Sequence, residues 1–576
     1  HMLSFPIQIF NDINLISSQK MNNYLLYRDI LDYKNKSADR DECSPIIPFD
    51  IKNNIIIHES QKGKAGKNTV DEYFEENGTL SSNWKEYSYR REQHRFSSDI
   101  FEAFQDKNVL VAEAGPGLGK TISYLIAGIK LSVTKKVPLV ISTYTKALQD
   151  QLFYKDIPLL MDILDIGFKA VLLKGKNNYI SKKKLNYILH NSHIIKDIKS
   201  IESCITLITW SYFTKTGDIS ECLGFNERGS LDLWRRLNAS LDLSAPGSYD
   251  ISGVDFYDRM CNESKDANVL IVNHSFLYTD LSFGNSNLFA KSLLIIDEAH
   301  NLPSAIKEQL ISGFSQYAFI LSLGRLLKDI NLVKDIDNSK FSKLNTNILD
   351  LKEQVIHSFN NLKDDFSSIY NKMEYNKSDL LYNQKMVYSS EVDFASLYKK
   401  IYSLIEDIQN IVEIIKKDDH KYPKTHLLNF YSILKRLDEI IKNVKIFKDN
   451  DNDYVKWYTL YKSSGENAIR LNTVPIDISK YVRNDIFSKF DSFVLCSGTL
   501  MINDSFRYFL ENVGLSEFSD IETTNKLYKS PFFYEEQMQI HIYKSEFDIN
   551  SSQYIEEIAD QICSLNKSLK KRIMVL

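Results

Sequence analysis

The sequence contains few cysteines and no closely spaced pair of them. Six cysteines are scattered over 576 residues without a CxxC arrangement, which argues against a disulfide framework and favours a reducing compartment. No apolar run reaches the roughly 18 residues of a membrane span, and the N-terminus has neither a basic start nor a small-residue cleavage site. We therefore expect a cytoplasmic protein with no membrane partner.

Positive and negative charges are nearly balanced. Lysine and arginine total 71 against 75 aspartate and glutamate, for a net charge of -4, so any track for a polyanion must come from local clustering. Hydrophobic residues make up 43% of the chain and aromatic residues 12%. This composition supports buried cores, and the length allows several domains of about 100 to 200 residues each.

One glycine-rich stretch lies between a predicted strand and a predicted helix. The apolar run from Val109 to Ala112 is followed by AGPGLGKT and then by ISYLIAGIKLSV, which suits a buried helix. This context is typical of a P-loop, in which backbone N–H groups converge on a phosphate, a lysine reaches the β and γ phosphates and a threonine holds Mg2+. A simple turn is the alternative. The predicted cradle comprises Ala114, Gly115, Gly117, Gly119, Lys120 and Thr121.

A second motif supplies paired carboxylates. The stretch SLLIIDEAHNLP places Asp297 and Glu298 at the end of an apolar strand. Asp297 is suited to positioning Mg2+, and Glu298 to orienting or deprotonating the attacking water. Together with the P-loop, this pair predicts an ATPase that uses ATP and Mg2+ as cofactors.

Two further strands end in hydroxyl-bearing residues. LVISTYTKALQDQL carries Thr145 and Lys146 at a strand-to-helix junction, and DSFVLCSGTLM carries Ser497 and Thr499. Hydroxyls and backbone amides at such junctions suit contacts with a phosphodiester backbone. We therefore predict that these four residues bind nucleic acid.

With these motifs the chain resembles superfamily 2 helicases, and DEAH with YRREQHRF upstream places the resemblance in the XPD/DinG branch. The strings DEYFEENGTLSSNW, LLKGKNNYI, TKTGD, ANVLIVNHSFLYTDL, PIDIS and SPFFYEEQ favour DinG-like helicases. The resemblance covers about Tyr73 to Leu576. It implies an α/β fold with a RecA-like helicase core, in which helices flank a parallel sheet. It also implies a monomeric, ATP-dependent DNA helicase that moves 5' to 3' on single-stranded DNA and opens duplexes or RNA-DNA hybrids.

The resemblance also suggests roles for further residues. Arg90 and Gln93 would read adenine, and His300 would couple the nucleotide loop to the SGT stretch by hydrogen bonding. Asn273 and His274 would lie near the core and the DNA path. A purely structural role as a helix cap is an equal alternative. The basic stretch KGKNNYISKKK suits phosphate contact and base stacking, and an ordinary solvated basic helix is its alternative. Its predicted nucleic-acid-binding residues are Lys174, Lys176, Asn178 and Tyr179.

The spacing of the motifs requires two insertions in the core, because neighbouring strands of one such domain are normally joined by short crossovers. The second insertion has strong helical periodicity, for example from Leu397 to Ile415. The expected domains are an N-terminal accessory segment (1–70), RecA-like domain 1 in three parts (71–180, 267–302 and 463–515), a vestigial iron-sulfur-type insertion (181–266), a helical arch (303–462) and the start of a truncated RecA-like domain 2 (516–576).

The first insertion departs from the family pattern. Relatives carry four cysteine ligands there, but this chain has Ser181 at the first position and Asp255 at the fourth. The remaining cysteines lack the paired spacing of cluster ligands, and a serine hydroxyl is a poor soft ligand. We therefore expect no iron-sulfur cluster. The insertion would instead be held by packing of Trp210, Phe213, Leu233 and Trp234.

Both ends of the chain leave alternatives open. The N-terminal segment is too short for the exonuclease that some relatives carry, so we expect an accessory module that binds nucleic acid or a partner. The arch is a second candidate for contact with a protein partner. No QxxGR string, which carries the family's final arginine pair, occurs in the 576 residues. Either the sequence is a truncated or proteolysed form or the polypeptide has lost its motor, and as written it is expected to bind nucleotide better than it hydrolyses it. A nucleic-acid clamp that binds ATP without unwinding and a DinG-like single-strand nuclease remain alternatives. Cluster-free relatives also serve CRISPR systems, a setting that no residue here demonstrates.

Overall fold

The structure is a computed structural model that divides into two compact units, His1–Lys529 and Ser530–Leu576. Most of the predicted accessory segment (1–70) and the last residues of the predicted RecA-like domain 2 (570–576) lie outside the residues that the structure describes. The described residues are 9, 13, 16, 57–60, 69–190, 195, 197–240, 255–283, 288–289, 291–332, 338–370, 393–417, 424–463, 466–517, 522–537, 542, 544–549 and 551–569.

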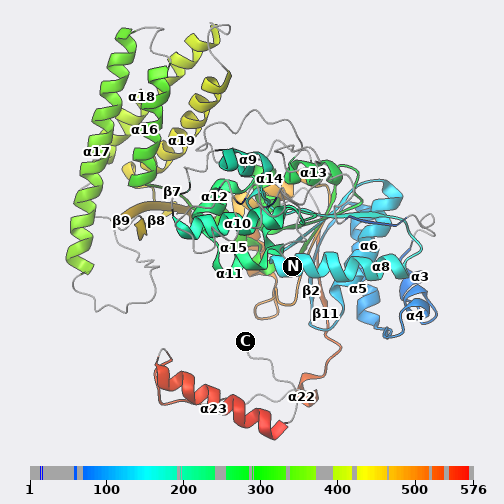
Figure 1. The fold of residues 1–576 in the computed structure, drawn as a ribbon. Helices are drawn as coiled ribbons and strands as arrows, with labels where there is room; N and C mark the ends of the chain where they lie inside the picture. The colour runs from blue at the N-terminus through cyan, green and yellow to red at the C-terminus, as the bar shows by residue number, and fades with distance from the viewer. Residues whose placement is uncertain are drawn as a thin grey trace, which may run out of the picture. The chain divides into compact units, whose positions relative to one another are not determined.

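An eight-stranded sheet organises the first unit (Figure 1). Seven strands run parallel, and the short β1 pairs antiparallel with β4. Because the carboxyl ends of parallel strands meet at one edge of a sheet, the loops after these strands come together in space. The order is β1 (His58–Glu59), β4 (Lys169–Leu172), β5 (Val269–Asn273), β3 (Leu139–Thr143), β6 (Leu293–Asp297), β10 (Phe493–Ser497), β2 (Val109–Ala114) and β11 (Thr523–Tyr528).

Helices cover both faces of the sheet because its strands are apolar on both sides. Alternate residues of β2 enter different apolar clusters: Val109 and Val111 lie in one, and Leu110 and Ala112 in the other. The predicted α/β fold with a parallel, helix-flanked, RecA-like core is confirmed. The helices that precede β2 in the chain or follow β2 and β3 are α3 (Asp71–Phe74), α4 (Thr79–Asn83), α5 (Arg91–Asp106), α6 (Lys120–Lys135), α7 (Lys146–Gln151), η3 (Leu152–Asp156) and α8 (Ile157–Ile163).

A group of helices is inserted between β4 and β5. Leu233 and Trp234 are buried in the same apolar cluster as one face of the sheet, and Trp210 packs against it. Phe213 is 57% exposed, so its predicted packing role is wrong, because it lies beyond the end of its helix in a turn. The inserted elements are η4 (Lys176–Asn178), α9 (Lys182–His190), α10 (Ile198–Ser211), η6 (Ile219–Glu221), α11 (Leu223–Arg228), α12 (Leu231–Leu237) and α13 (Phe256–Ser264).

A second insertion, between β6 and β10, forms long helices with their own apolar core. Its predicted periodicity is confirmed in α18, where Leu397, Ile401, Leu404 and Ile408 are all buried. A three-stranded antiparallel sheet lies at the base of the helices. The elements are β7 (Ser312–Ser315), α16 (Gln316–Leu332), α17 (Asn338–Tyr370), α18 (Phe394–Lys417), α19 (Lys424–Lys448), β8 (Tyr454–Ser463) and β9 (Glu466–Pro475).

The remaining elements follow the strands of the core or belong to the second unit. Within the described residues, no helix combines the length and apolar character that crossing a membrane requires. In the first unit these elements are α14 (His274–Phe283), η7 (Ala299–Asn301), α15 (Leu302–Leu310), α20 (Ser479–Tyr481), η9 (Val482–Ile486), η10 (Phe487–Lys489) and α21 (Arg507–Val513). The second unit contains α22 (Tyr534–Gln537) and α23 (Ser552–Leu569).

Candidate nucleotide-binding site

The glycine-rich loop joins the end of β2 to the start of α6, as its sequence predicts. Gly117 and Gly119 have φ angles of 77° and 87°, which glycine adopts without the strain that other residues would incur. A Cβ atom on Gly119 would also lie 2.3 Å from Gln93 Nε2. Since α6 begins at Lys120, the first turn of this 16-residue helix presents backbone N–H groups suited to a phosphate.

Arg90 and Gln93 contact this loop directly. Arg90 Nη1 donates a hydrogen bond to the carbonyl oxygen of Gly117 at 2.6 Å. Gln93 Nε2 donates to the carbonyl oxygen of Gly119 at 3.3 Å. Both residues brace the loop in this structure, and their predicted contact with adenine stays a prediction.

The paired carboxylates meet the P-loop lysine although they lie far from it in the chain. Lys120 Nζ is 3.6 Å from Glu298 Oε1. Tyr124, one turn further along α6, donates a hydrogen bond to Asp297 Oδ2 at 3.0 Å across 173 positions of sequence. Glu298 has a φ of 53°, an uncommon conformation for a residue with a side chain. These groups therefore form one cluster at the carboxyl edge of the sheet.

Burial sets the electrostatics of this cluster. Burial raises the pKa of Asp297, the neighbouring Glu298 raises it further, and the positive charge of Lys120 opposes both. Burial likewise raises the pKa of Tyr124 well above its usual value, so its hydroxyl stays a donor. A buried carboxylate beside the glycine-rich loop is suited to a bound cation.

The structure offers residues that fit ATP and Mg2+ at this edge. Lys120 keeps 16% of its side chain exposed beside the loop glycines, and Thr121 follows it in the first turn of α6. Thr121 and Asp297 would hold the metal ion, which supplies charge neutralisation on the phosphates.

The loop after β10 closes the other side of the cluster. His300 Nδ1 and Ser497 Oγ are 2.6 Å apart, and Ser497 Oγ donates to Glu298 Oε2 at 3.2 Å. The backbone N–H of Thr499 lies 3.4 Å from Ser497 Oγ. The contact predicted between His300 and this loop is therefore present, while its coupling role stays a prediction.

Two further residues were missed by the sequence reasoning: Tyr124, which belongs to the cluster, and Glu113, which lies beside it and contacts the loop after β10. Tyr124 stands four positions after Lys120, so helical spacing already places both on one side of α6. Glu113 interrupts the apolar strand VLVAEA, and its Oε2 accepts the backbone N–H groups of Leu500 and Met501 at 2.6 Å each. The acidic side chain in an otherwise apolar strand could have indicated that Glu113 has a specific partner.

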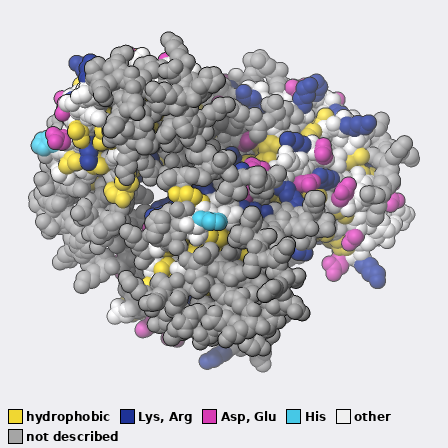
Figure 2. All heavy atoms as spheres, turned by 45° about the horizontal axis from the view of Figure 1, so that its top comes forward, with side chains coloured by type: hydrophobic (Ala, Val, Ile, Leu, Met, Phe, Trp, Pro, Cys, Tyr) yellow, Lys and Arg dark blue, Asp and Glu magenta, His cyan; other side chains and the backbone are white. Residues whose placement is uncertain are grey.

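Some predicted nucleic-acid-binding residues lie at accessible positions. Thr145, Lys146, Lys176 and Thr499 are exposed, and Asn178 is half-buried. Thr145 also accepts a hydrogen bond from the N–H of Leu148 as the N-cap of α7. On the face shown in Figure 2, basic and acidic side chains are interspersed.

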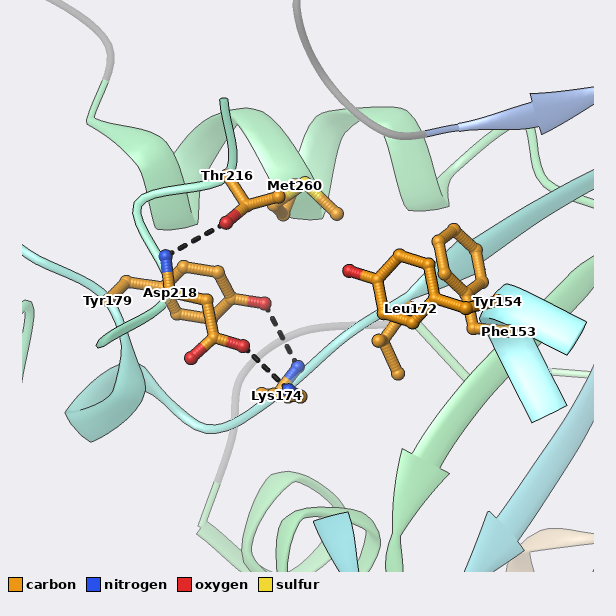
Figure 3. A pocket seen from close by; sticks show the side chains of 8 residues that line it. All are labelled: Phe153, Tyr154, Leu172, Lys174, Tyr179, Thr216, Asp218 and Met260. Carbon is orange, nitrogen blue, oxygen red and sulfur yellow. Dashed lines mark hydrogen bonds and ion pairs between the residues drawn. The ribbon is translucent and has the colours of Figure 1, made fainter. Parts of the chain in front are cut away.

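Lys174 and Tyr179 do not fit the predicted contact with nucleic acid, because both residues are only 2% exposed. Figure 3 shows Lys174 directed at Asp218, and the distance from Nζ to Oδ2 is 2.6 Å. Lys174 Nζ also lies 2.9 Å from Asp150, and the Tyr179 hydroxyl accepts the N–H of Lys174. These interactions hold both residues in the interior beside a small pocket.

His274 and Ser497 are also fully buried, so they too cannot touch a nucleic acid through their side chains in this conformation. His274 Nδ1 is 2.7 Å from Ser142 Oγ, and burial lowers the pKa of His274 to about 3. Asn273 Oδ1 accepts the N–H of Phe276 at 2.8 Å, which is the structural cap that the sequence left as an alternative.

The donor set of the first insertion does not fit a four-thiolate cluster. Ser181 Oγ donates to Asp255 Oδ2 at 2.7 Å, and both residues are buried. Burial raises the pKa of the Cys204 thiol to about 12, which disfavours the thiolate that a metal needs. Within the described part of the chain, no group of three or more His, Cys, Asp or Glu side chains is placed to hold a metal ion.

The fold is an α/β core with helices on both faces of a mostly parallel sheet, and the site joins a glycine-rich loop and Lys120 to the carboxylates of Asp297 and Glu298. The chain is 28% identical over 512 residues to the 3'-5' exonuclease DinG of Bacillus subtilis, a match that covers 85% of this chain and 54% of the relative. It is 26% identical over 523 residues to the ATP-dependent DNA helicase YoaA of Haemophilus influenzae, covering 88% of this chain and 74% of that protein. These relatives confirm the resemblance to DinG-like helicases.

A third relative and a solved structure are also similar to the chain. A DinG of Staphylococcus epidermidis is 26% identical, covering 87% of this chain and 55% of the relative, so the chain spans about half the length of its DinG relatives. A solved XPD helicase matches 83% of this chain and 70% of its own at 13% identity, but a TM-score of 0.33 is too low to establish a shared fold. No family model matches the chain.

Proposed function

We propose that the chain provides the ATP-binding core of a DinG-type, ATP-dependent DNA helicase. The observation that carries this proposal is the meeting of Lys120 with Asp297 and Glu298 beside a glycine-rich loop. The relatives named DinG and YoaA support it. By the same resemblance, the protein would act in the cytoplasm as a monomer, move 5' to 3' on single-stranded DNA and open duplexes or RNA-DNA hybrids.

In this proposal each group of the cluster has one task. Backbone N–H groups of the loop surround the phosphates, and Lys120 neutralises charge on the β and γ phosphates. Glu298 orients or deprotonates the attacking water. His300, held between Glu298 and Ser497, transmits the state of the nucleotide to the loop after β10.

The energy of strand separation explains why such a cluster would be needed. Opening duplex DNA costs on average about 1.4 kcal/mol per base-pair step, so separating more than a few pairs requires repeated input of free energy. The exposed residues Thr145, Lys146, Lys176 and Thr499 would contact the backbone of the strand. Contacts with phosphates should make binding weaken as salt is raised.

The proposed division of the chain follows the predicted boundaries except the last one. Residues 71–180, 267–302 and 463–529 would form RecA-like domain 1, because β11 (Thr523–Tyr528) pairs with β2 in the sheet, and 530–576 would begin RecA-like domain 2. Residues 181–266 would be a cluster-free form of the iron-sulfur domain, since Ser181 and Asp255 bind each other there. Residues 303–462 would be the arch, and 1–70 an accessory segment that contacts a partner.

Binding of a fluorescent ATP analogue, with and without Mg2+, tests the proposal. Lys120→Ala should abolish binding, whereas Lys307→Ala, an exposed lysine on α15, should leave it unchanged. Glu298→Gln should bind the analogue normally but lower any single-turnover hydrolysis by at least about 100-fold. Normal nucleotide binding by Lys120→Ala would refute the cradle.

The same preparations separate the proposal from its two alternatives. A clamp would bind ATP and single-stranded DNA without hydrolysis in the presence of DNA. A nuclease would degrade labelled single strands with Mg2+ or Mn2+ in the absence of ATP. This control is necessary because two relatives are named 3'-5' exonuclease DinG.

A further inference from the structure

The side chain of Glu113 connects two strand ends of the candidate site. Glu113 is the next-to-last residue of β2 and lies opposite Ser497 of β10 in the sheet register. Its Oε2 atom accepts hydrogen bonds from the backbone N–H groups of Leu500 and Met501, each at 2.6 Å. One carboxylate oxygen therefore fixes two successive amides of the loop that follows β10.

This position would ordinarily be apolar. Val109, Val111 and Glu113 point to the same face of the sheet because side chains alternate along a strand, and the two valines are fully buried. A carboxylate at the end of such a row is costly unless charged hydrogen bonds compensate for lost water. Leu500 is buried in the same apolar cluster as the valines, so the loop folds back over this face and brings its amides to Glu113.

The loop is held at its other end by the nucleotide cluster. Ser497 contacts both Glu298 and His300, and a Cβ atom on Gly498 would lie 3.5 Å from Lys120 Nζ. Thr499 lies between these two anchors and is exposed. A shift of the backbone at Thr499 therefore requires that the contacts of Ser497 or the hydrogen bonds to Glu113 break.

We propose that Glu113 is a positioning residue that holds the Ser497–Met501 loop and thereby makes nucleic-acid affinity depend on the bound nucleotide. This inference rests on the proposed function, and Glu113 itself touches neither nucleotide nor nucleic acid. Without the Glu113 anchor the loop can relax independently of Glu298 and His300. Nucleotide and DNA would then bind the same chain without influencing each other.

The first measurement is the ratio of single-stranded DNA affinities with and without a non-hydrolysable ATP analogue and Mg2+. We expect about a tenfold ratio for the unmodified chain and a ratio near one for Glu113→Ala, with the affinity for the analogue itself changed less than about threefold. Glu308→Gln, an exposed acid on α15, should keep the full ratio. A full ratio in Glu113→Ala would overturn the inference.

Hydrogen exchange at the two amides provides a second test that holds even if Glu113→Ala does not fold. Glu113→Gln keeps an oxygen acceptor but loses the charge, so exchange at Leu500 and Met501 should accelerate at least about tenfold while β10 stays protected. Unchanged exchange at both amides would overturn the inference. Failure of the unmodified chain to bind the analogue would instead count against the proposed function.

Discussion

Ser181 and Asp255 form a hydrogen bond of 2.7 Å across 74 positions of sequence, and both side chains are buried. The resemblance to DinG-like helicases assigns these two positions to the first and fourth ligands of a cluster. Asp255 Oδ1 also accepts the backbone N–H groups of Lys182 and Phe256. Hydrogen bonds thus join the starts of α9 and α13, which a metal centre would otherwise join.

Replacement of Ser181 by alanine should loosen the first insertion. The buried Asp255 carboxylate would lose its hydroxyl donor, at a cost of about 1 to 3 kcal/mol. Chemical denaturation would measure the loss, and hydrogen exchange should place it in α9 and α13. Ser304→Ala, an exposed serine on α15, should change stability by less than about 0.5 kcal/mol. Equal stability of the two variants would show that the hydrogen bond does not hold the insertion.

The iron content of the purified chain tests the cluster-free assignment separately. We expect no stoichiometric iron and no visible absorbance band, because the donor set consists of a serine, an aspartate and cysteines without paired spacing. Ser181→Cys should not bind iron either, since one added thiol leaves the set incomplete. Brown protein with stoichiometric iron and sulfide would contradict the assignment.

Lys174 and Lys176 should respond differently to removal of their charges. Lys174 is buried between Asp218 and Asp150. Burial lowers its pKa, but the two carboxylates outweigh burial and leave that pKa raised. Lys174→Ala would leave buried negative charge unpaired and should cost about 3 kcal/mol of stability. The exposed Lys176→Ala should leave stability unchanged and reduce the salt slope of DNA binding by about one. Denaturation and salt titrations of both variants distinguish the two outcomes, and a stable Lys174→Ala with weakened DNA binding would contradict this division.

The cluster of Lys120, Asp297 and Glu298 could be predicted from the sequence because a general rule connects them. Each lies at or after the carboxyl end of an apolar strand, and the carboxyl ends of parallel strands meet at one edge of the sheet. The helical periodicity of α18 could be predicted equally well, because burial of one helix face imposes spacings of three and four between apolar residues. In both cases a local pattern determines the position in space.

Lys174 could not be placed in this way. The sequence pattern of a lysine run does not distinguish lysines that face solvent from lysines that pair with acids in the interior. The partners of Lys174, Asp150 and Asp218, lie 24 and 44 positions away in the chain. The hydrogen bond between Ser181 and Asp255 could not be predicted from the sequence for the same reason. Pairings of this kind depend on how the insertion docks on the sheet, and no local pattern encodes that.

Tyr124 should matter for the metal ion more than for the nucleotide. Its hydroxyl donates to Asp297 Oδ2, and residues that orient a metal ligand typically affect metal affinity by 10- to 100-fold. Tyr124→Phe should therefore raise the Mg2+ concentration needed for half-maximal binding of the ATP analogue by about tenfold, with metal-free binding unchanged. Tyr508→Phe serves as the matched control, because Tyr508 is 59% exposed. Identical Mg2+ titrations for both variants would remove Tyr124 from the site.

His274 should make stability depend on pH in a defined window. Burial lowers its pKa to about 3 in the folded chain, whereas an unfolded histidine titrates near 6.5. Between these values the unfolded state binds a proton that the folded state does not, so stability falls as pH decreases below about 6.5. From pH 7 to pH 5 this one group should remove roughly 2 kcal/mol.

The comparison of two histidine variants isolates that contribution. His274→Asn should show a shallower loss of stability between pH 7 and pH 5, even if the variant is less stable throughout, because the slope reports proton uptake and not packing. His190→Asn, at an exposed histidine at the end of α9, should keep the full slope. If both variants lose stability with pH as steeply as the unmodified chain, His274 does not stay neutral in the folded state, and its burial against Ser142 is not maintained in solution.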